Sequence, residues 1–335
     1  MSLCHEMPGQ LLRYIIADLQ LFWNPMILIA GSANLDFVVR ANHIPGPGET
    51  VLGQDFKTYP GGKGANQAVA SARAGGADTH MLLCVGEDAY AMHLLNSLRE
   101  ANIKLIQAPS HGLPTGCAFI CVADNAENAI TVAPGANQSL QAEHLPDLTG
   151  FSHVLMQLEI PLATVTAYAQ AAKKQGVKVV LNAAPAQPLP PELLAEVDIL
   201  VVNEDELASL VSTCASVAEN LAQLAVPCAV VTLGARGCVA RLGSNFFAQP
   251  SYSVNAVDTT GAGDTFCGVL VATLSQGHNM SQALRQASAA AALACTAHGA
   301  QSSIPNASAV QAFLASQAAC DDAATQDLRR YCGLA

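Results

Sequence analysis

The sequence predicts an α/β protein with a doubly wound, mainly parallel sheet flanked by helices and a small β-sheet lid. Short, continuous apolar runs alternate with longer helical stretches along most of the chain, which is the order of a parallel sheet with crossover helices. Two segments of shorter, alternating runs interrupt that order. With 335 residues, of which 51% are hydrophobic, the chain is long enough to bury one large core.

The predicted strands of the large sheet are largely apolar throughout, as is typical of strands covered by helices on both faces. They are residues 27–30, 80–85, 154–157, 177–181, 199–202 and 229–232. The stretches between and after them have the length and composition of helices. The predicted helices are residues 65–74, 89–101, 162–175, 204–210, 217–224, 262–275 and 280–297.

The two interrupting segments, residues 35–59 and 103–132, contain alternating runs such as FVVRANHI and CAFICV. Alternation predicts strands with one exposed face, so we expect a small sheet, the lid, at the edge of a domain that spans residues 26–318. Residues 1–25 are an extension of unknown role, because charged residues interrupt their apolar run and exclude a spanning helix or a good signal peptide. Residues 319–335 are expected to be a frayed tail.

Charge and cysteine content exclude several classes of partner. The formal net charge is −11 and no basic run occurs, so we expect neither nucleic acid nor a membrane as a partner. The 11 cysteines are scattered and none forms a CxxC pair, which is typical of reduced thiols. A cytoplasmic protein is therefore expected.

A glycine-rich motif, YPGGKGANQAVASARAGG, surrounds the start of the first predicted helix. Glycines allow a ligand to approach the backbone, and a helix start offers free N–H groups. Lys63 and Asn66 could hydrogen-bond hydroxyl groups. The phosphate-loop pattern GxxxxGK[ST] is absent, and a tight turn alone would also explain the glycines.

Three polar side chains follow predicted strands at the edge where open α/β sheets bind ligands. Asn34 and Asp36 follow the first strand in AGSANLDFVV, and Glu159 follows the strand of MQLEIP. A charge beside an apolar run is costly unless it faces a polar pocket. The alternatives are an Asx turn for Asp36 and a solvated loop carboxylate for Glu159.

Two more strand ends carry candidate nucleotide contacts. In VVNEDELASL, Asn203 and Glu206 form the pattern of a capping box, and they could instead face a magnesium–phosphate group, directly or through water. In VVTLGARG, Gly234 and Gly237 form a turn that could lie against the sugar and phosphates of a nucleotide. A hairpin turn explains these glycines equally well.

The motif DTTGAGDTF opens the predicted helix 262–275. The N–H groups of residues 261–264 would point outward with the helix dipole behind them, which makes an anion hole. Asp264 lies at its rim, where it could accept a proton from an alcohol that attacks a bound anion. Asp258 cannot share that role, but a cation site completed by carbonyls and a hydroxyl of ACTAHGAQSSIP would explain it.

The sequence resembles the ribokinase branch of the PfkB sugar-kinase family in its motifs GGKGANQA, DTTGAGDTF and NEDE, and also in GSANLD and MQLEIP. The resemblance extends from about residue 26 to residue 313. It implies a large α/β domain whose β-sheet lid also forms a homodimer contact. It further implies ATP-dependent phosphorylation of the 5-hydroxyl of ribose, with Mg²⁺ and K⁺ as cofactors.

The same resemblance implies roles for residues that match the family motifs. Asp264 would be the catalytic base, and the anion hole would be the N–H groups of Gly261, Ala262 and Gly263. The sugar hydroxyls would contact Asn34, Asp36, Gly62, Lys63, Asn66 and Glu159. The ATP site would be lined by Asn203, Thr232, Gly234, Gly237, Gly263 and Ser288, with Glu206 on the magnesium side. The potassium site would consist of Asp258, Ser303 and the carbonyls of Thr260, Ala294, Ala297 and Gly299. Two features depart from the family: Ser288 stands where a bulkier His or Asn is expected beside the adenine, and residues 1–25 have no counterpart.

Other substrates and classes are open at this point. A kinase for 2-deoxyribose, adenosine or another PfkB-type substrate would share the catalytic half. The polar residues near the sugar and the aromatic content of 5% favour a small polyhydroxylated sugar over a nucleoside. A non-catalytic sugar sensor is disfavoured because Asp264 is present, and a dehydrogenase because GxGxxG is absent after the first strand.

Overall fold

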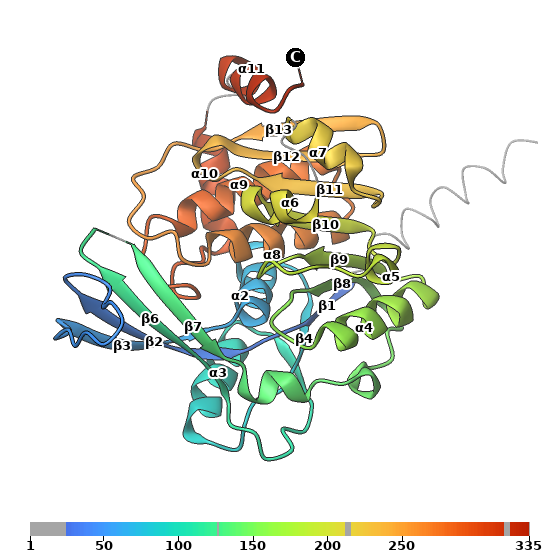
Figure 1. The fold of residues 1–335 in the computed structure, drawn as a ribbon. Helices are drawn as coiled ribbons and strands as arrows, with labels where there is room; N and C mark the ends of the chain where they lie inside the picture. The colour runs from blue at the N-terminus through green and yellow to red at the C-terminus, as the bar shows by residue number, and fades with distance from the viewer. Residues whose placement is uncertain (1–24, 126, 212–215, 318–321, 335) are drawn as a thin grey trace, which may run out of the picture.

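The computed structural model describes residues 25–125, 127–211, 216–317 and 322–334, which form a large central sheet with helices on both faces and a separate small sheet at one side (Figure 1). The predicted fold class is confirmed. The predicted extension lies outside the described residues, apart from Pro25. None of the helices in the described ranges is long and apolar enough to cross a membrane.

The large sheet has nine strands in the order β13-β12-β11-β10-β9-β8-β1-β4-β5. Neighbouring strands from β11 to β5 pair in parallel, whereas β12 pairs antiparallel with both β11 and β13. All six predicted strands are present. The strands are β1 (Met26–Ala30), β4 (Thr79–Leu83), β5 (Lys104–Gln107), β8 (Phe151–Met156), β9 (Lys178–Asn182), β10 (Ile199–Asn203), β11 (Cys228–Thr232), β12 (Gly237–Leu242) and β13 (Asn245–Pro250).

Helices cover both faces of this sheet and produce two apolar cores, which is why its strands are apolar at consecutive positions. In β1, Ile27 and Ile29 lie in one core with α2, α3 and α8–α10, and Leu28 lies in the other with α4–α7 and α11. The helices are α2 (Lys63–Val69), which continues as a π-helical turn (Ala70–Ala74), α3 (Ala89–Glu100), α4 (Leu162–Lys174), α5 (Pro191–Leu194), α6 (Glu204–Leu210), α7 (Val217–Gln223), α8 (Ala262–Ser275), α9 (Met280–Ala294), α10 (Ala307–Ser316) and α11 (Asp322–Tyr331).

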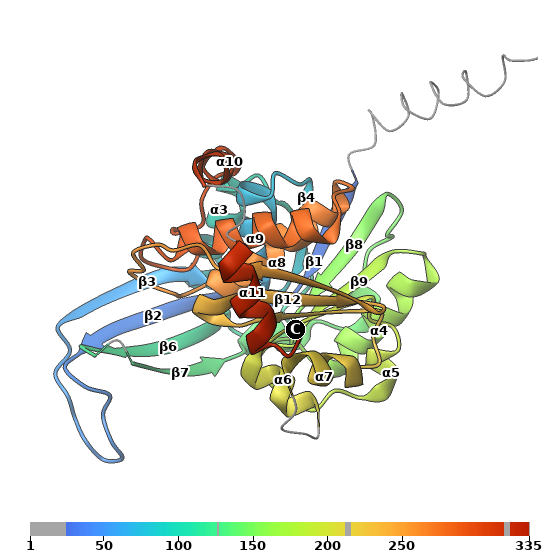
Figure 2. The same cartoon turned by 90° about the horizontal axis from the view of Figure 1, so that it is seen from above.

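The small sheet projects from one side of the molecule in both views and has the strand order β3-β2-β6-β7 (Figures 1 and 2). Its strands are β2 (Asn34–Ala41), β3 (Asp55–Gly61), β6 (Gly116–Ala123) and β7 (Asn128–Ala133). The expected lid is thus present, but its second insert was predicted to begin too early. Residues 104–107 form β5, which pairs with β4 in the large sheet. An edge strand that is covered incompletely shows the same alternation as a lid strand, so the pattern did not distinguish them.

Two predicted ends of elements are wrong. The helix 280–297 ends at Ala294, because the chain then turns back and the Cys295 carbonyl accepts hydrogen bonds from the N–H groups of Val257 and Asp258. The tail is not frayed over its described part, since α11 packs on the body of the molecule with Leu328 and Cys332 buried in a core. The few apolar residues of this polar segment form no clear helical pattern, so the sequence did not predict α11.

Candidate active site

The candidate site lies where the carboxyl ends of β1, β8, β9, β10 and β11 meet the N-termini of α2 and α8. Parallel strands end at the same edge, so the loops after them gather there even though the residues are far apart in sequence. Asp264, in the first turn of α8, is buried at the centre of this region.

Two side-chain amides of α2 fix the Asp264 carboxylate. Asn66 Nδ2 donates to Oδ2 at 3.0 Å, and Gln67 Nε2 donates to Oδ1 at 2.9 Å. Asp264, together with Glu159 and Glu206, raises the pKa of Lys63 against the effect of burial, so Lys63 is charged. A carboxylate held in one orientation beside a cation is suited to accept a proton from a bound hydroxyl.

Gln67 was not predicted, although it is the residue that orients Asp264 Oδ1. It is fully buried, and Gln157 Nε2 donates to its Oε1 at 2.6 Å, which turns its amide nitrogen toward Asp264. The same nitrogen also donates to Asn182 Oδ1 at 2.9 Å. The signal was available in the sequence, because a glutamine within an apolar strand or helix face needs a buried partner.

The start of α8 presents backbone N–H groups beside this carboxylate. Gly261, with φ 74°, adopts the left-handed conformation that turns the chain into the helix. Among the described residues, the N–H groups of Gly261, Gly263 and Asp264 have no hydrogen-bond acceptor. The Ala262 N–H group was expected in the anion hole, but it donates to the Thr259 carbonyl at 3.2 Å.

Glu159 lies at the centre of a second polar cluster, which joins it to Asn34 and Lys63 of the predicted sugar contacts and to Ser32, which was not predicted. Its Oε2 accepts hydrogen bonds from Ser32 Oγ at 2.6 Å, the Lys63 N–H at 3.1 Å and Asn34 Nδ2 at 3.5 Å. Asn137, which was not predicted, donates from Nδ2 to Asn34 Oδ1 at 2.7 Å. These bonds fix the loop after β1 against the loop after β8.

Asp36 is buried on β2 at the mouth of the lid. Burial, then the nearby carboxylates of Glu159 and Asp264, raises its pKa to about 7. No described residue donates a hydrogen bond to its carboxylate, so its oxygens can accept hydrogen bonds from a ligand. The carboxylate lies against Gly61, where a Cβ atom would be 2.1 Å from Oδ2, so this approach requires glycine. The structure therefore brings Asp36 and Asp264 to one site and excludes an Asx turn for Asp36.

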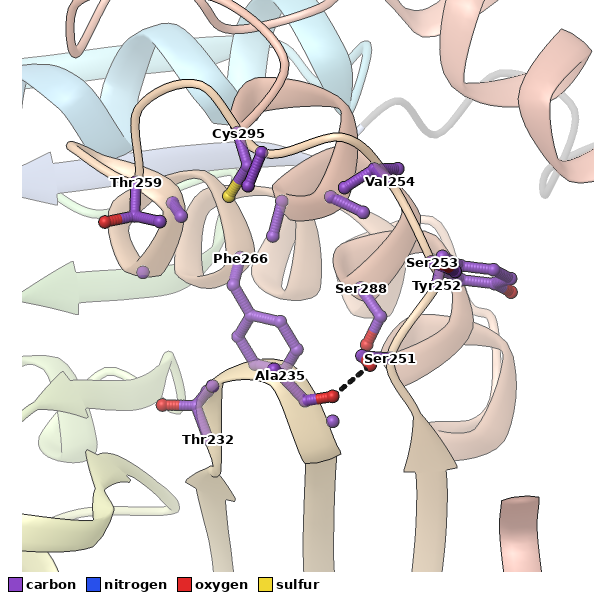
Figure 3. Close-up of a pocket in the computed structure, with 17 residues that line it drawn as sticks. Thr232, Ala235, Ser251, Tyr252, Ser253, Val254, Thr259, Phe266, Ser288 and Cys295 are labelled. Carbon is purple, nitrogen blue, oxygen red and sulfur yellow. Dashed lines mark hydrogen bonds between the residues drawn. The ribbon is translucent and has the colours of Figure 1, made fainter.

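Two cavities meet at the start of α8. The larger, of about 550 Å³, is lined mostly by small and apolar side chains, including Phe266 and Cys295, and it contains the predicted nucleotide residues Thr232, Gly234, Gly237, Gly263 and Ser288 (Figure 3). The smaller, of about 150 Å³, is lined by Lys63, Asn203, Glu206 and Asp264 among others. Thr232 and Gly263 line both cavities, so a nucleotide in the larger one could extend its phosphates toward Asp264.

Asn203 and Glu206 form the capping box that the sequence predicts. The Asn203 N–H donates to Glu206 Oε2 at 2.8 Å, and the Glu206 N–H donates to Asn203 Oδ1 at 2.7 Å. No described residue donates to Glu206 Oε1, and burial raises the pKa of this carboxyl. A carboxylate oxygen free on the side of the smaller cavity fits a hydrated Mg²⁺, which prefers oxygen ligands and retains water.

Asp258 joins the turn before α8 to the loop after α9. It accepts hydrogen bonds from the N–H groups of Thr260 and Gly299, both at 2.9 Å. Although burial opposes them, these bonds hold its pKa below the ordinary value. The other residues expected at this site, Ala294, Ala297 and Ser303, are in α9 or the loop after it. The Ala294 carbonyl accepts a hydrogen bond from the Ala297 N–H at 3.3 Å, and His298 Nδ1 lies 3.8 Å from Asp258 Oδ2.

The comparisons with known proteins define the class first. The pfkB family of carbohydrate kinases matches residues 24–307, and the chain belongs to this family. It is therefore a carbohydrate kinase.

Within the family, the chain is similar to several ribokinases and to a deoxyribokinase. The ribokinase of Haemophilus influenzae is 39% identical over 302 residues, which cover 86% of this chain and 98% of that protein. The structure of Arabidopsis thaliana ribokinase complexed with ribose and ATP superposes with a TM-score of 0.79 at 31% identity and covers 87% of this chain and 98% of that one. The Salmonella typhi deoxyribokinase is 33% identical over 293 residues, which cover 84% of this chain and 95% of that protein.

Proposed function

We propose that the protein transfers the γ-phosphoryl group of ATP to the 5-hydroxyl of D-ribose. The observation that carries this proposal is the position of Asp264. Two amides fix its carboxylate beside the N–H groups at the start of α8. The carboxylate also lines the smaller cavity, which adjoins the larger cavity where a nucleotide would fit. The similarity to ribokinases, one of them complexed with ribose and ATP, supports the choice of substrates.

In the proposed reaction, Asp36, Asn34 and Glu159 bind the sugar hydroxyls and direct the 5-hydroxyl toward Asp264. The proton of that hydroxyl moves to Asp264 as its oxygen attacks the γ-phosphorus of ATP. The N–H groups at the start of α8 stabilise the charge on the transferred phosphoryl group, and ADP leaves. Gly62, Lys63 and Asn66 complete the sugar site.

Two cations are part of the proposal. Mg²⁺ would neutralise phosphate charge, and Glu206 with Asn203 would hold it, directly or through water. K⁺ would bind at Asp258 and the neighbouring carbonyls, where it would order the loop before α8 without touching the substrate. Both roles are supported by the oxygen donors that these residues present.

We also propose a cytoplasmic homodimer that forms through the lid. The eight cysteines among the described residues are free thiols, which suits a reducing compartment. On the lid, strand alternation and register place Ile120, Ile130 and Val132 on the same face as Asp36, and Ile130 is 56% exposed. A second lid packed there would bury these side chains and shield the sugar from water.

Ribose is preferred to 2-deoxyribose because a buried carboxylate without a partner rejects an analogue that lacks a hydroxyl. The similarity to a deoxyribokinase makes 2-deoxyribose the second candidate. The test is ADP release with ribose, 2-deoxyribose, fructose and adenosine as acceptors. We expect the highest kcat/KM with ribose. A higher value with any other acceptor would contradict the substrate assignment.

A further inference from the structure

Helix α11 lies beyond the part of the chain that matches the family, which ends at residue 307, yet it packs against β13, and Ser251 and Tyr252, which follow β13, line the larger cavity. The strand against which it packs, β13, is the edge strand of the large sheet (Figure 1). Leu328 and Cys332 are buried in the same core as Val231 and Val239 of β11 and β12. The Cys332 carbonyl accepts a hydrogen bond from the Ala218 N–H at 3.0 Å, which fixes the end of α11 to the start of α7.

Tyr331, at the end of α11, contacts two segments that line the candidate ATP site. The Arg236 guanidinium carbon lies 4.3 Å from the centre of the Tyr331 ring. The Tyr331 hydroxyl donates a hydrogen bond to Glu204 Oε1. Arg236 belongs to the turn Gly234–Arg236, whose first two residues line the larger cavity, and Glu204 follows Asn203, which lines the smaller one. One side chain therefore joins two walls of the site.

The turn after β11 has few other restraints on its outer side. Ser251 Oγ donates to the Ala235 carbonyl (Figure 3). The Ser251 N–H donates to the Arg236 carbonyl at 3.3 Å, and the Leu233 N–H donates to the Gly237 carbonyl at 2.8 Å. Arg236 itself is exposed and makes no hydrogen bond or ion pair through its side chain with a described residue. Backbone hydrogen bonds thus hold the main chain of the turn, and stacking on Tyr331 restrains the Arg236 side chain.

We propose that α11 is a positioning element for the nucleotide, in which Tyr331 holds the turn Gly234–Arg236 and the start of α6 at the separation that ATP binding requires. The proposal rests on the proposed function, because it assumes that these cavities hold ATP. It makes Tyr331 a residue that acts through Arg236 and Glu204 without touching the nucleotide.

The test is the Kd for ADP with Mg²⁺, measured by titration calorimetry on the full chain. Stacking of a cation on a ring and a hydrogen bond to a carboxylate are each modest, so Tyr331→Ala should raise this Kd about five- to tenfold. Tyr331→Phe keeps the ring and should raise it only about two- to threefold. The control is Arg330→Ala, which removes an exposed ion pair with Asp327 on the same helix and should leave the Kd unchanged.

A double-mutant cycle shows whether Tyr331 acts through Arg236. If it does, Arg236→Ala combined with Tyr331→Ala will weaken ADP binding no more than the stronger single change. Weakening by the product of the two single effects would overturn the proposal, and so would an unchanged Kd for ADP in Tyr331→Phe and Tyr331→Ala. An equal loss of ribose affinity would also overturn it. Because ADP binding requires no turnover, a failure to phosphorylate any sugar would refute the proposed function separately.

Discussion

Lowering the pH should weaken sugar binding, because Asp36 must be ionised to accept hydrogen bonds from two hydroxyls. In the free protein, burial and the carboxylates of Glu159 and Asp264 raise the pKa of Asp36 to about 7. Hydroxyl donors from a bound sugar favour the ionised form and lower that pKa. Sugar binding is therefore expected to release a proton when the pH is below 7.

The size of the effect follows from the two pKa values. If bound ribose returns the pKa of Asp36 from about 7 to its ordinary value of 3.8, the Kd for ribose will rise about tenfold for each pH unit below 7. Between pH 8 and pH 5, the Kd should rise about a hundredfold. Near pH 6, close to one proton should be released for each ribose bound.

Titration calorimetry in two buffers of different ionisation enthalpy measures both quantities. The matched control is Asp55→Asn, which neutralises an exposed carboxylate on the neighbouring strand β3 and should leave the pH dependence intact. Asp36→Asn should bind ribose weakly and with little change between pH 5 and pH 8. A native Kd that is constant over this range, with no proton release, would refute the assignment of Asp36 as an ionised acceptor.

Four further predictions follow from the same geometry. Because the pKa of Asp36 is higher in the folded than in the unfolded protein, its contribution to stability is present at low pH and is lost as the pH rises through about 7. Asp36→Asn should thus raise the free energy of unfolding at pH 8, by at most about 4 kcal/mol, and the gain should vanish near pH 4 in urea denaturation. Asp264→Asn should lower kcat by several orders of magnitude with sugar binding nearly unchanged, and a variant within tenfold of the native rate would exclude it as the base. Gln67→Leu removes one donor to that base, so kcat should fall about 10- to 100-fold with KM for the sugar nearly unchanged; a change in KM alone would indicate a packing role only. K⁺ should activate the native enzyme but not Asp258→Ala, and equal rates in Na⁺ and K⁺ buffers would count against the cation site.

The large sheet and its ligand edge could be predicted because burial on both faces leaves a strong pattern. Runs such as residues 199–202 are apolar at every position, and the polar residues after them fall at one edge for topological reasons. Asn34 and Glu159 were found in this way as polar side chains shortly after a strand, and Asp264 as a carboxylate in the first turn of a helix. Such residues can be found from the order of apolar and polar positions along the chain, without any three-dimensional contact.

The remainder depends on contacts that a one-dimensional pattern does not contain. The strands β12 and β13 form a hairpin at the sheet edge, where burial is incomplete and the apolar pattern is weak. Helix α11 buries only Leu328 among its ten residues, so its stability comes from docking rather than from its own sequence. Gln67 stands on an apolar helix face, which indicates a buried partner, but the pattern does not identify Gln157 and Asp264 as its partners.

In the proposed reaction, the charges in the site would connect recognition of the sugar to closure of the lid. Asp264 and Glu159 each accept hydrogen bonds from neighbouring groups, whereas Asp36 is buried with none from a described residue. Without sugar, an ionised Asp36 therefore opposes the compact position of β2, the lid strand that carries it. Under the proposed function, sugar hydroxyls would remove that penalty, so bound acceptor would stabilise the closed lid and exclude water before transfer. A sugar that lacks one of these hydroxyls should consequently lose kcat as well as affinity, because part of its binding energy no longer closes the site.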